Sequence, residues 1–331
     1  MNDAVDTEPD DIHDDPTRVR SVRSGEPWRW AWTVALPVGV AGAVIGLVPW
    51  LISGARLPPQ VLWATTVRPE AMPFVLLPFS FVTVILIFSL LIVGSAAAGI
   101  GGRALRVRGW ALLLLVVGVL IVQIPATVQT AGVVEKGLQD RLESNVYLFA
   151  LIAGTGLSIL VGLVVTILVA GAPRAGALIG LTIGAIGMAS WIGALIDPTR
   201  MGQGLLADVI VIVPWIAPVL TGIAIAWTGI GTAGRVIAAL FALVLVWVAP
   251  AVTTALFNAL SNQVLVRSSS DVIDYAVGVF QAALLTPELA LRPIIATALV
   301  AAVGLGVRAL VGRRRRRASA SRLGLTTAGG G

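Results

Sequence analysis

Long apolar runs, separated by short segments that contain arginine, glycine or proline, cover most of the chain. About 20 consecutive apolar residues are enough for a helix to cross the hydrocarbon core of a bilayer. Runs of this length occupy residues 30–52, 73–98, 109–128, 146–171, 175–196, 205–228, 235–257 and 291–312. The pattern predicts an all-α protein, a polytopic transmembrane helical bundle of about eight spans.

The fourth and fifth runs are separated only by Ala172-Pro173-Arg174. Together they are far longer than one crossing requires, and a proline interrupts a helix because its nitrogen carries no proton. We therefore count two spans here.

Composition supports a membrane protein. The chain has 331 residues, of which 57% are hydrophobic and 12% are charged, whereas soluble domains average about 25% charged residues. One water-soluble core of this size does not bury so much apolar surface. We therefore expect lipid to be the main solvent of the folded chain.

Basic residues predict the orientation of the spans. Most of the 23 lysines and arginines lie on one side of the membrane if the N-terminus is cytoplasmic, and cytoplasmic loops carry the excess of basic residues in membrane proteins. Both termini are then cytoplasmic and the number of spans is even. The arginine-rich, cysteine-free composition suits the plasma (inner) membrane of a bacterium, in which the protein would be multi-pass.

Two polar tails flank the spans. Residues 1–28 begin with an acidic stretch and are predicted to form a disordered cytoplasmic tail. Residues 313–331 form a second predicted disordered tail, rich in arginine. Its first five residues are expected to bind anionic lipid headgroups at the inner face, whereas nucleic-acid binding is not expected because no folded module surrounds them. These five residues are Arg313, Arg314, Arg315, Arg316 and Arg317.

Two segments between the spans have apolar residues at helical spacing. Val134, Leu138 and Leu142 form one stripe, and residues 271–285 contain a second. Both are interpreted as interfacial helices on the outer leaflet. The alternative is that they extend the adjoining spans.

The two halves of the chain show weak similarity in the same order, which predicts a tandem duplication. Residues 29–171 and 175–312 would be two four-span repeats, parallel because four crossings return the chain to the same side. Three matches carry this prediction: Gly39 to Trp50 with Gly180 to Trp191, Gly99-Ile100-Gly101 with Gly229-Ile230-Gly231, and Pro125 to Thr130 with Pro250 to Thr254.

The two matched prolines mark a candidate site. Pro125 and Pro250 each end an apolar run, and Thr127 and Thr253 follow them. A proline leaves the carbonyl one turn earlier without its helical donor, and a threonine hydroxyl is a suitable replacement. We expect the two openings to face each other and form an outer vestibule for a ligand or a partner segment.

Small residues predict close helix packing. Gly176, Gly180 and Gly184 recur every four residues, and Gly42 and Gly46 repeat this spacing. Such glycines serve either packing within the bundle or dimerisation. Packing within the bundle is favoured because the chain supplies several partner helices of its own.

Residue chemistry argues against an enzyme. The chain has no cysteine, and its single histidine, His13, lies in the acidic N-terminal stretch. Asp208, near the outer end of the sixth run, is interpreted as an interfacial residue that reaches water rather than as a proton site. We therefore expect no metal and no cofactor.

Two classes of function remain. The first is a non-catalytic accessory or scaffold component of a bacterial cell-envelope assembly, with membrane-protein partners. The alternative is a permease for a neutral or lipid-like small molecule without a buried charge relay. The first is preferred because the uncharged spans show no recognisable binding constellation.

Overall fold

The computed structural model describes residues 31–60, 62–64, 68, 71–196, 203–261 and 269–327. Helices make up nearly all of these ranges, and no strand longer than an isolated bridge occurs in them. The helices are α1 (Ala31–Ile52), η2 (Phe81–Thr83, a 3₁₀ turn), α2 (Val84–Ala104), α3 (Trp110–Gly137), α4 (Leu142–Gly171), α5 (Arg174–Leu195), α6 (Gln203–Thr228), α7 (Ala233–Ser261), α8 (Ser269–Leu285) and α9 (Pro287–Thr327).

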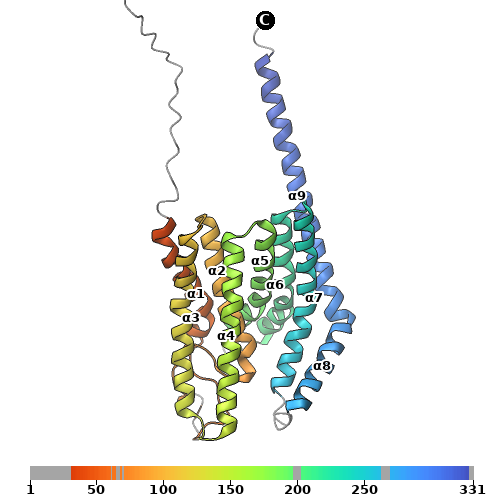
Figure 1. Cartoon of the computed structure of the whole chain (residues 1–331). Helices are drawn as coiled ribbons and strands as arrows, with labels where there is room; N and C mark the ends of the chain where they lie inside the picture. The colour runs from red at the N-terminus through yellow and green to blue at the C-terminus, as the bar shows by residue number, and fades with distance from the viewer. Residues whose placement is uncertain are drawn as a thin grey trace, which may run out of the picture.

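Eight of these helices are long and apolar enough to cross a membrane, so the predicted all-α bundle of eight spans is confirmed. The Ala172-Pro173 turn separates α4 from α5, which makes the fourth and fifth runs two spans, as expected. Figure 1 shows the helices side by side, with α1 beginning and α9 leaving at the same end of the bundle. We call this the near end and the opposite one the far end.

The last helix is longer than the sequence pattern indicates. Residues 313–327 continue α9 beyond the bundle, where a disordered tail was expected (Figure 1). Arginine and alanine have high helix propensity, and extending an existing helix needs no new nucleus. The predicted acidic tail, residues 1–28, lies outside the described residues.

Helices of the two halves pack in the same pairs. In the first half α1 packs on α2 and α3, and α2 packs on α4. In the second half α5 packs on α6 and α7, and α6 packs on α9. Helix α5 also packs on α2 and α4, and in this way joins the halves. The predicted duplication is consistent with this arrangement and stays a prediction.

One of the three sequence matches between the halves is wrong. Gly99-Ile100-Gly101 lies inside α2, whereas Gly229-Ile230-Gly231 forms the turn after α6. Gly229 has a φ of +74°, a conformation that glycine adopts without strain. The two tripeptides resemble each other only because glycine is used both for close packing and for turns.

The predicted packing glycines lie at contacts within the chain. A methyl group added at Gly42 would lie 2.4 Å from the backbone nitrogen of Ala98 in α2, and one at Gly46 would lie 2.3 Å from the Leu90 carbonyl oxygen. In α5, Gly180 faces α4 and Gly184 faces Ala96 of α2, while Gly176 lies against Ala172 in the preceding turn. Their close approaches therefore need no second copy of the chain.

Several described residues of the connection between α1 and α2 are buried, and residues 73–80, which the sequence pattern assigned to the second span, lie before that span. Leu57, Val75, Leu77 and Phe79 are fully or almost fully buried, and they form the largest apolar core together with the far halves of α2, α3 and α4. The Leu77 amide donates to Thr130 Oγ1 at 3.0 Å, and the Trp50 indole donates to the Val75 carbonyl oxygen at 2.9 Å. We call residues 53–60 and 71–80 the far-end plug.

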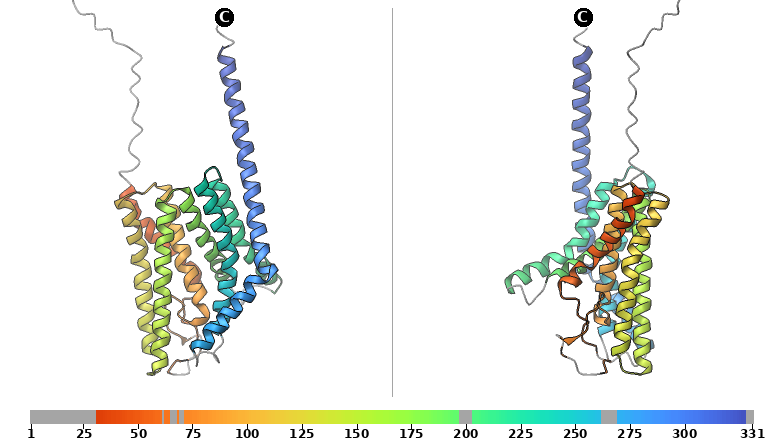
Figure 2. Two further views of the ribbon diagram at one scale, coloured as in Figure 1. Left: turned by 45° about the vertical axis from the view of Figure 1, so that its right-hand side comes forward. Right: turned by 90° about the vertical axis from the view of Figure 1, so that its left-hand side faces the viewer.

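The two segments predicted as interfacial helices have different outcomes. Residues 133–137 are the last turn of α3, with Val134 fully buried, so the alternative of a span extension holds there. The second segment forms a separate helix, α8, which packs along α7. Figure 2 shows α8 slanting from the far end towards the start of α9.

Candidate functional site: a cavity in the second half

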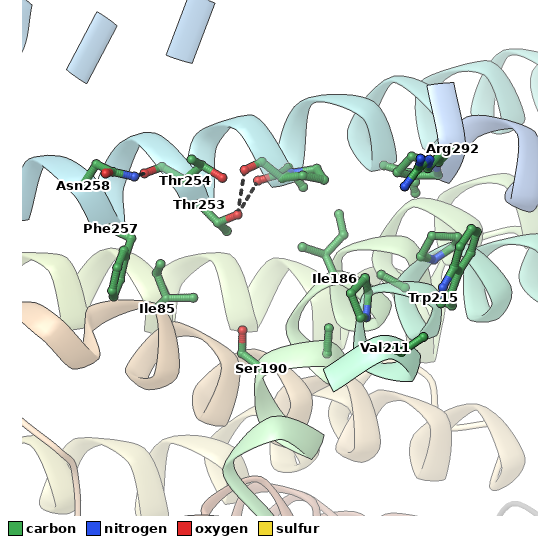
Figure 3. Close-up of a pocket in the computed structure, with 18 residues that line it drawn as sticks. Ile85, Ile186, Ser190, Val211, Trp215, Thr253, Thr254, Phe257, Asn258 and Arg292 are labelled. Carbon is green, nitrogen blue, oxygen red and sulfur yellow. Dashed lines mark hydrogen bonds between the residues drawn. The ribbon is translucent and has the colours of Figure 1, made fainter. Parts of the chain in front are cut away.

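A cavity of about 810 Å³ lies among the helices of the second half. Helices α5, α6, α7 and α9 supply its walls, and α2 contributes one residue (Figure 3). The lining residues are Ile85, Ile186, Ala189, Ser190, Val211, Pro214, Trp215, Ala217, Pro218, Val246, Ala249, Pro250, Thr253, Thr254, Phe257, Asn258, Arg292 and Pro293.

Prolines shape three of the four principal walls. Pro214 and Pro218 lie within α6, Pro250 within α7, and Pro293 near the start of α9. Each removes one helical hydrogen bond and places its ring against the preceding turn, which bends a helix away from its neighbours. Figure 2 shows the first part of α6 turning outward from the bundle. The bends give the helices room to separate and form the cavity.

The lining is apolar except for a few polar groups. Thr253 Oγ1 donates within α7 to the carbonyl oxygens of Ala249 and Pro250, at 3.0 and 2.9 Å, and Asn258 Nδ2 donates to the Thr254 carbonyl oxygen at 2.8 Å. Among the lining residues, Arg292 is the one with a charged side chain. Figure 3 shows Arg292 and Trp215 at one end of the cavity, and Phe257 and Asn258 at the other.

The cavity belongs to the far half of the bundle. Arg308, further along α9, donates to the Trp227 carbonyl oxygen at 2.8 Å, at the near end of α6. Sixteen residues separate Arg292 from Arg308, which is about 24 Å of helix at 1.5 Å per residue. A bilayer core is about 30 Å thick. Arg292 is the second residue of the apolar span Leu291–Val311, and Figure 1 shows the bend between α8 and α9, which precedes it, part-way between the two ends of the bundle.

The near end is closed across the two halves. Arg103 of α2 donates to the carbonyl oxygens of Val169 and Ala172 at the end of α4. Its guanidinium carbon also lies 5.5 Å from the centre of the Trp227 ring in α6, a distance suited to a cation–π contact. Arg103 thus connects α2, α4 and α6 at the near end.

The predicted vestibule is only half formed. Pro250 and Thr253 line the cavity, whereas Pro125 and Thr127 of α3 are not among its lining residues, and Pro125 is exposed on the bundle surface. The Thr127 hydroxyl donates to the Gln123 carbonyl oxygen at 2.8 Å. Each proline frees the carbonyl oxygen four residues before it, at positions 121 and 246. Neither threonine hydroxyl donates to that oxygen, so the expected replacement of the lost hydrogen bond is wrong. The prolines do not face each other because α5, rather than a direct α3–α7 contact, joins the halves.

Several lining residues were not placed at a binding site by the sequence, among them Ser190, Trp215, Asn258 and Arg292. Arg292 offered a signal, since it is a charge at the start of an apolar span. A local ion pair with Glu288 is the simplest interpretation from spacing, and it stays a prediction because the Glu288 side chain lies outside the described part of the structure. Asp208 likewise has no described side chain.

Metal chemistry finds no support in the described part of the chain, which contains no group of three histidine, cysteine, aspartate or glutamate residues able to hold an ion. No family model, curated protein or solved structure matches the chain. Any function must therefore be argued from the cavity itself.

Proposed function

We propose that this integral membrane protein binds a lipid-like amphiphile, without catalysis, in the cavity of its second half. The observation that carries the proposal is an apolar cavity of about 810 Å³ with Arg292 on its wall. Ligand cavities typically measure about 300–1,000 Å³ and combine an apolar lining with a few polar groups. The cavity has both features.

The surroundings favour a lipid chain as the occupant. The walls belong to membrane spans, so acyl chains are the most abundant molecules beside the cavity. Moving a chain from the bilayer into an apolar cavity involves little change in polarity, and close packing then decides whether it stays. Thr254 and Asn258 provide polar groups at one end of the cavity for a headgroup.

The cavity favours one of the two classes expected from the sequence. A permease for a neutral or lipid-like molecule needs such a site and needs no buried charge relay. An accessory or scaffold role in a bacterial cell-envelope assembly, with membrane-protein partners, stays a prediction for which the cavity gives no support. Binding is the step that a permease and a lipid-dependent accessory protein would share.

The orientation is part of the same proposal. Helix directions place Arg103, Arg174, Arg235 and Arg308 at the near end, which favours a cytoplasmic near end with both termini inside the plasma membrane of a bacterium. The cavity would then open in the outer half of the bilayer. Binding of anionic headgroups by Arg313 through Arg317 at the inner face is expected on the same grounds.

Lipid that stays with the purified protein tests the proposal. Ala249 lines the cavity, so Ala249→Trp should fill part of it and reduce the lipid that remains bound after mild detergent extraction, measured by mass spectrometry of the intact protein. Ala150→Trp, on the exposed face of α4, is the matched control and should retain the wild-type amount. Equal retention by both variants would contradict lipid binding in this cavity.

A further inference from the structure

The wall that α7 gives to the cavity changes from apolar to polar along its length. The residues of this helix that line the cavity between Val246 and Pro250 are apolar. Thr253, Thr254 and Asn258, further along the helix, also line the cavity and carry a hydroxyl or an amide. The wall is therefore amphipathic along its length, as a lipid molecule is.

The polar end of this wall lies where the hydrocarbon core of a bilayer ends. Helix α7 begins at the near end, and Arg235 is its third residue. Basic residues flank membrane spans, so Arg235 marks the near boundary of the core. At 1.5 Å per residue, Thr254 lies about 29 Å and Asn258 about 35 Å further along the helix, and the core is about 30 Å thick. Both polar residues are thus at the level of the headgroups of the far leaflet, the one at the far end.

The lined stretch of α7 is about as long as one leaflet is thick. Val246 and Asn258 are separated by about 18 Å of helix, and one leaflet contributes about half of the 30 Å core. Figure 3 shows Asn258 at one end of the cavity and Arg292 at the other. One acyl chain of the far leaflet therefore fits along this wall, with its headgroup beside Asn258 and its tail towards the middle of the bundle.

The polar end offers neutral hydrogen-bonding groups. Asn258 Nδ2 donates to the Thr254 carbonyl oxygen at 2.8 Å, which uses one of the two protons of this amide. The second proton, the Asn258 Oδ1 and the Thr254 hydroxyl can pair with a ligand, and together they include donors and acceptors. A hydroxyl group, which both donates and accepts, matches such a set.

Charge at this end disfavours an anionic headgroup. Residues 258–285, from the end of α7 to the end of α8, contain two aspartates and one arginine, a formal charge of −1. One of the aspartates, Asp274, is exposed on α8, which packs along α7. Arg292 does not offset this charge, because it lies at the opposite end of the cavity and has an interaction partner of its own. A phosphate beside Asn258 would therefore meet negative charge.

We propose that the cavity holds a lipid of the far leaflet whose uncharged headgroup carries a hydroxyl that pairs with Thr254 and Asn258. One acyl chain lies along the apolar part of the α7 wall. The inference rests on the proposed function and adds the class of headgroup and the direction of the chain. Diacylglycerol is the simplest lipid with this chemistry.

Photo-cross-linking of the full-length protein in phosphatidylcholine nanodiscs tests the direction of the chain. Two diacylglycerol probes, each added as a trace, would carry the photoactivatable group beside the ester or near the end of one acyl chain. We expect the first probe to label residues 253–258 and the second to label residues 211–218, as located by tandem mass spectrometry. The reversed pattern would overturn the proposed direction.

The headgroup is tested by three probes with the same photoactivatable chain end. These probes are diacylglycerol, its 3-deoxy analogue, in which hydrogen replaces the hydroxyl, and phosphatidic acid, in which a phosphate is attached there. We expect about fivefold more labelling by diacylglycerol than by the analogue, the factor that one net hydrogen bond provides. A similar excess over phosphatidic acid is expected from one unfavourable charge near a membrane surface.

Variants connect this preference with the two residues. Thr254→Val and Asn258→Leu remove the polar groups at similar side-chain size, and the double variant should bring diacylglycerol and its deoxy analogue to equal labelling while labelling by the analogue persists. Asn145→Leu removes an exposed asparagine at the start of α4, also at the far end. It is the matched control and should keep the wild-type ratio.

The possible failures are distinguishable. If the wild-type protein is labelled equally by diacylglycerol and its deoxy analogue, or at least as well by phosphatidic acid, the headgroup inference is wrong and lipid binding is unaffected. A preference that survives in the double variant would also overturn it. An absence of cavity labelling with all probes would instead contradict the proposed function. Because the wild-type ratios are decisive by themselves, poor folding of a variant does not protect the inference.

Discussion

The first half of the molecule is filled where the second half is open. In the first half, the far-end plug supplies Leu57, Val75, Leu77 and Phe79 to a core between α2, α3 and α4. In the second half, only residues 196–202 connect α5 to α6, α8 and α9 meet at a bend before Pro287, and a cavity lies beside an apolar core formed by α5, α6, α7 and α9. The same helix pairs support both arrangements.

The contrast suggests different roles for the two halves: close packing in the first half stabilises the bundle, and the cavity of the second half is the proposed binding site. Close packing stabilises membrane helices, because lipid provides no hydrophobic driving force for their association. The filled half holds its helices together by glycine contacts and buried side chains, whereas the open half retains these mainly towards the near end. The proposed ligand site thus lies in the half with fewer such contacts, beside a half that is closely packed.

Shortening a buried side chain of the far-end plug should have the largest effect. Leu77 is fully buried, so Leu77→Ala should lower the free energy of unfolding by about 2–5 kcal/mol, through lost contacts and the void left behind. Ile186→Ala at the cavity wall should cost less, because fewer atoms surround that side chain. Thermal unfolding in detergent measures both. Equal costs would show that the second half is packed as tightly as the first.

Adding a methyl group at a helix crossing should have an intermediate effect. Gly46→Ala places a carbon 2.3 Å from the Leu90 carbonyl oxygen, so α1 and α2 must move apart, at a cost of about 1–3 kcal/mol. Gly154→Ala in α4 meets no atom within 4 Å and is the matched control. The control should be neutral or slightly stabilising, since alanine favours the helix. A stable Gly46→Ala protein would argue against the α1–α2 contact.

Removing the break between α8 and α9 should change stability least, by less than about 1 kcal/mol, because the residues around it are partly exposed. Pro287→Ala restores an amide that can donate to the Ala283 carbonyl oxygen and make the second half resemble the first. Hydrogen exchange should show this new amide protected, together with weaker lipid labelling of the cavity. An unprotected amide would mean that tertiary packing, rather than proline, maintains the bend.

The sequence predicted the spans well because their signal is local. Eight long apolar runs are visible without knowledge of their neighbours, and the glycine spacing of α1 and α5 identified residues that do lie at helix contacts. The far-end plug was not predicted, since its backbone is irregular and has neither helical nor strand periodicity. Leu57 and Leu77 are buried by residues distant in the sequence.

The candidate site was predicted only in part, because it too is formed by residues that are distant in the sequence. Pro250 and Thr253 were identified, but their proposed partners Pro125 and Thr127 lie elsewhere. The sequence pattern predicted an interfacial segment followed by a span at residues 271–312, and the structure has α8 and α9 there, divided at Pro287. The part that these helices play in the cavity depends on residues distant in the sequence.

An experimental structure of the wild-type protein in lipid nanodiscs is the most direct test of the contrast between a filled and an open half. We expect elongated acyl-chain density between α5, α6 and α7, within the cavity, and no such density within the first-half core. A second half whose side chains close the cavity, or a cavity that contains no lipid density, would contradict it.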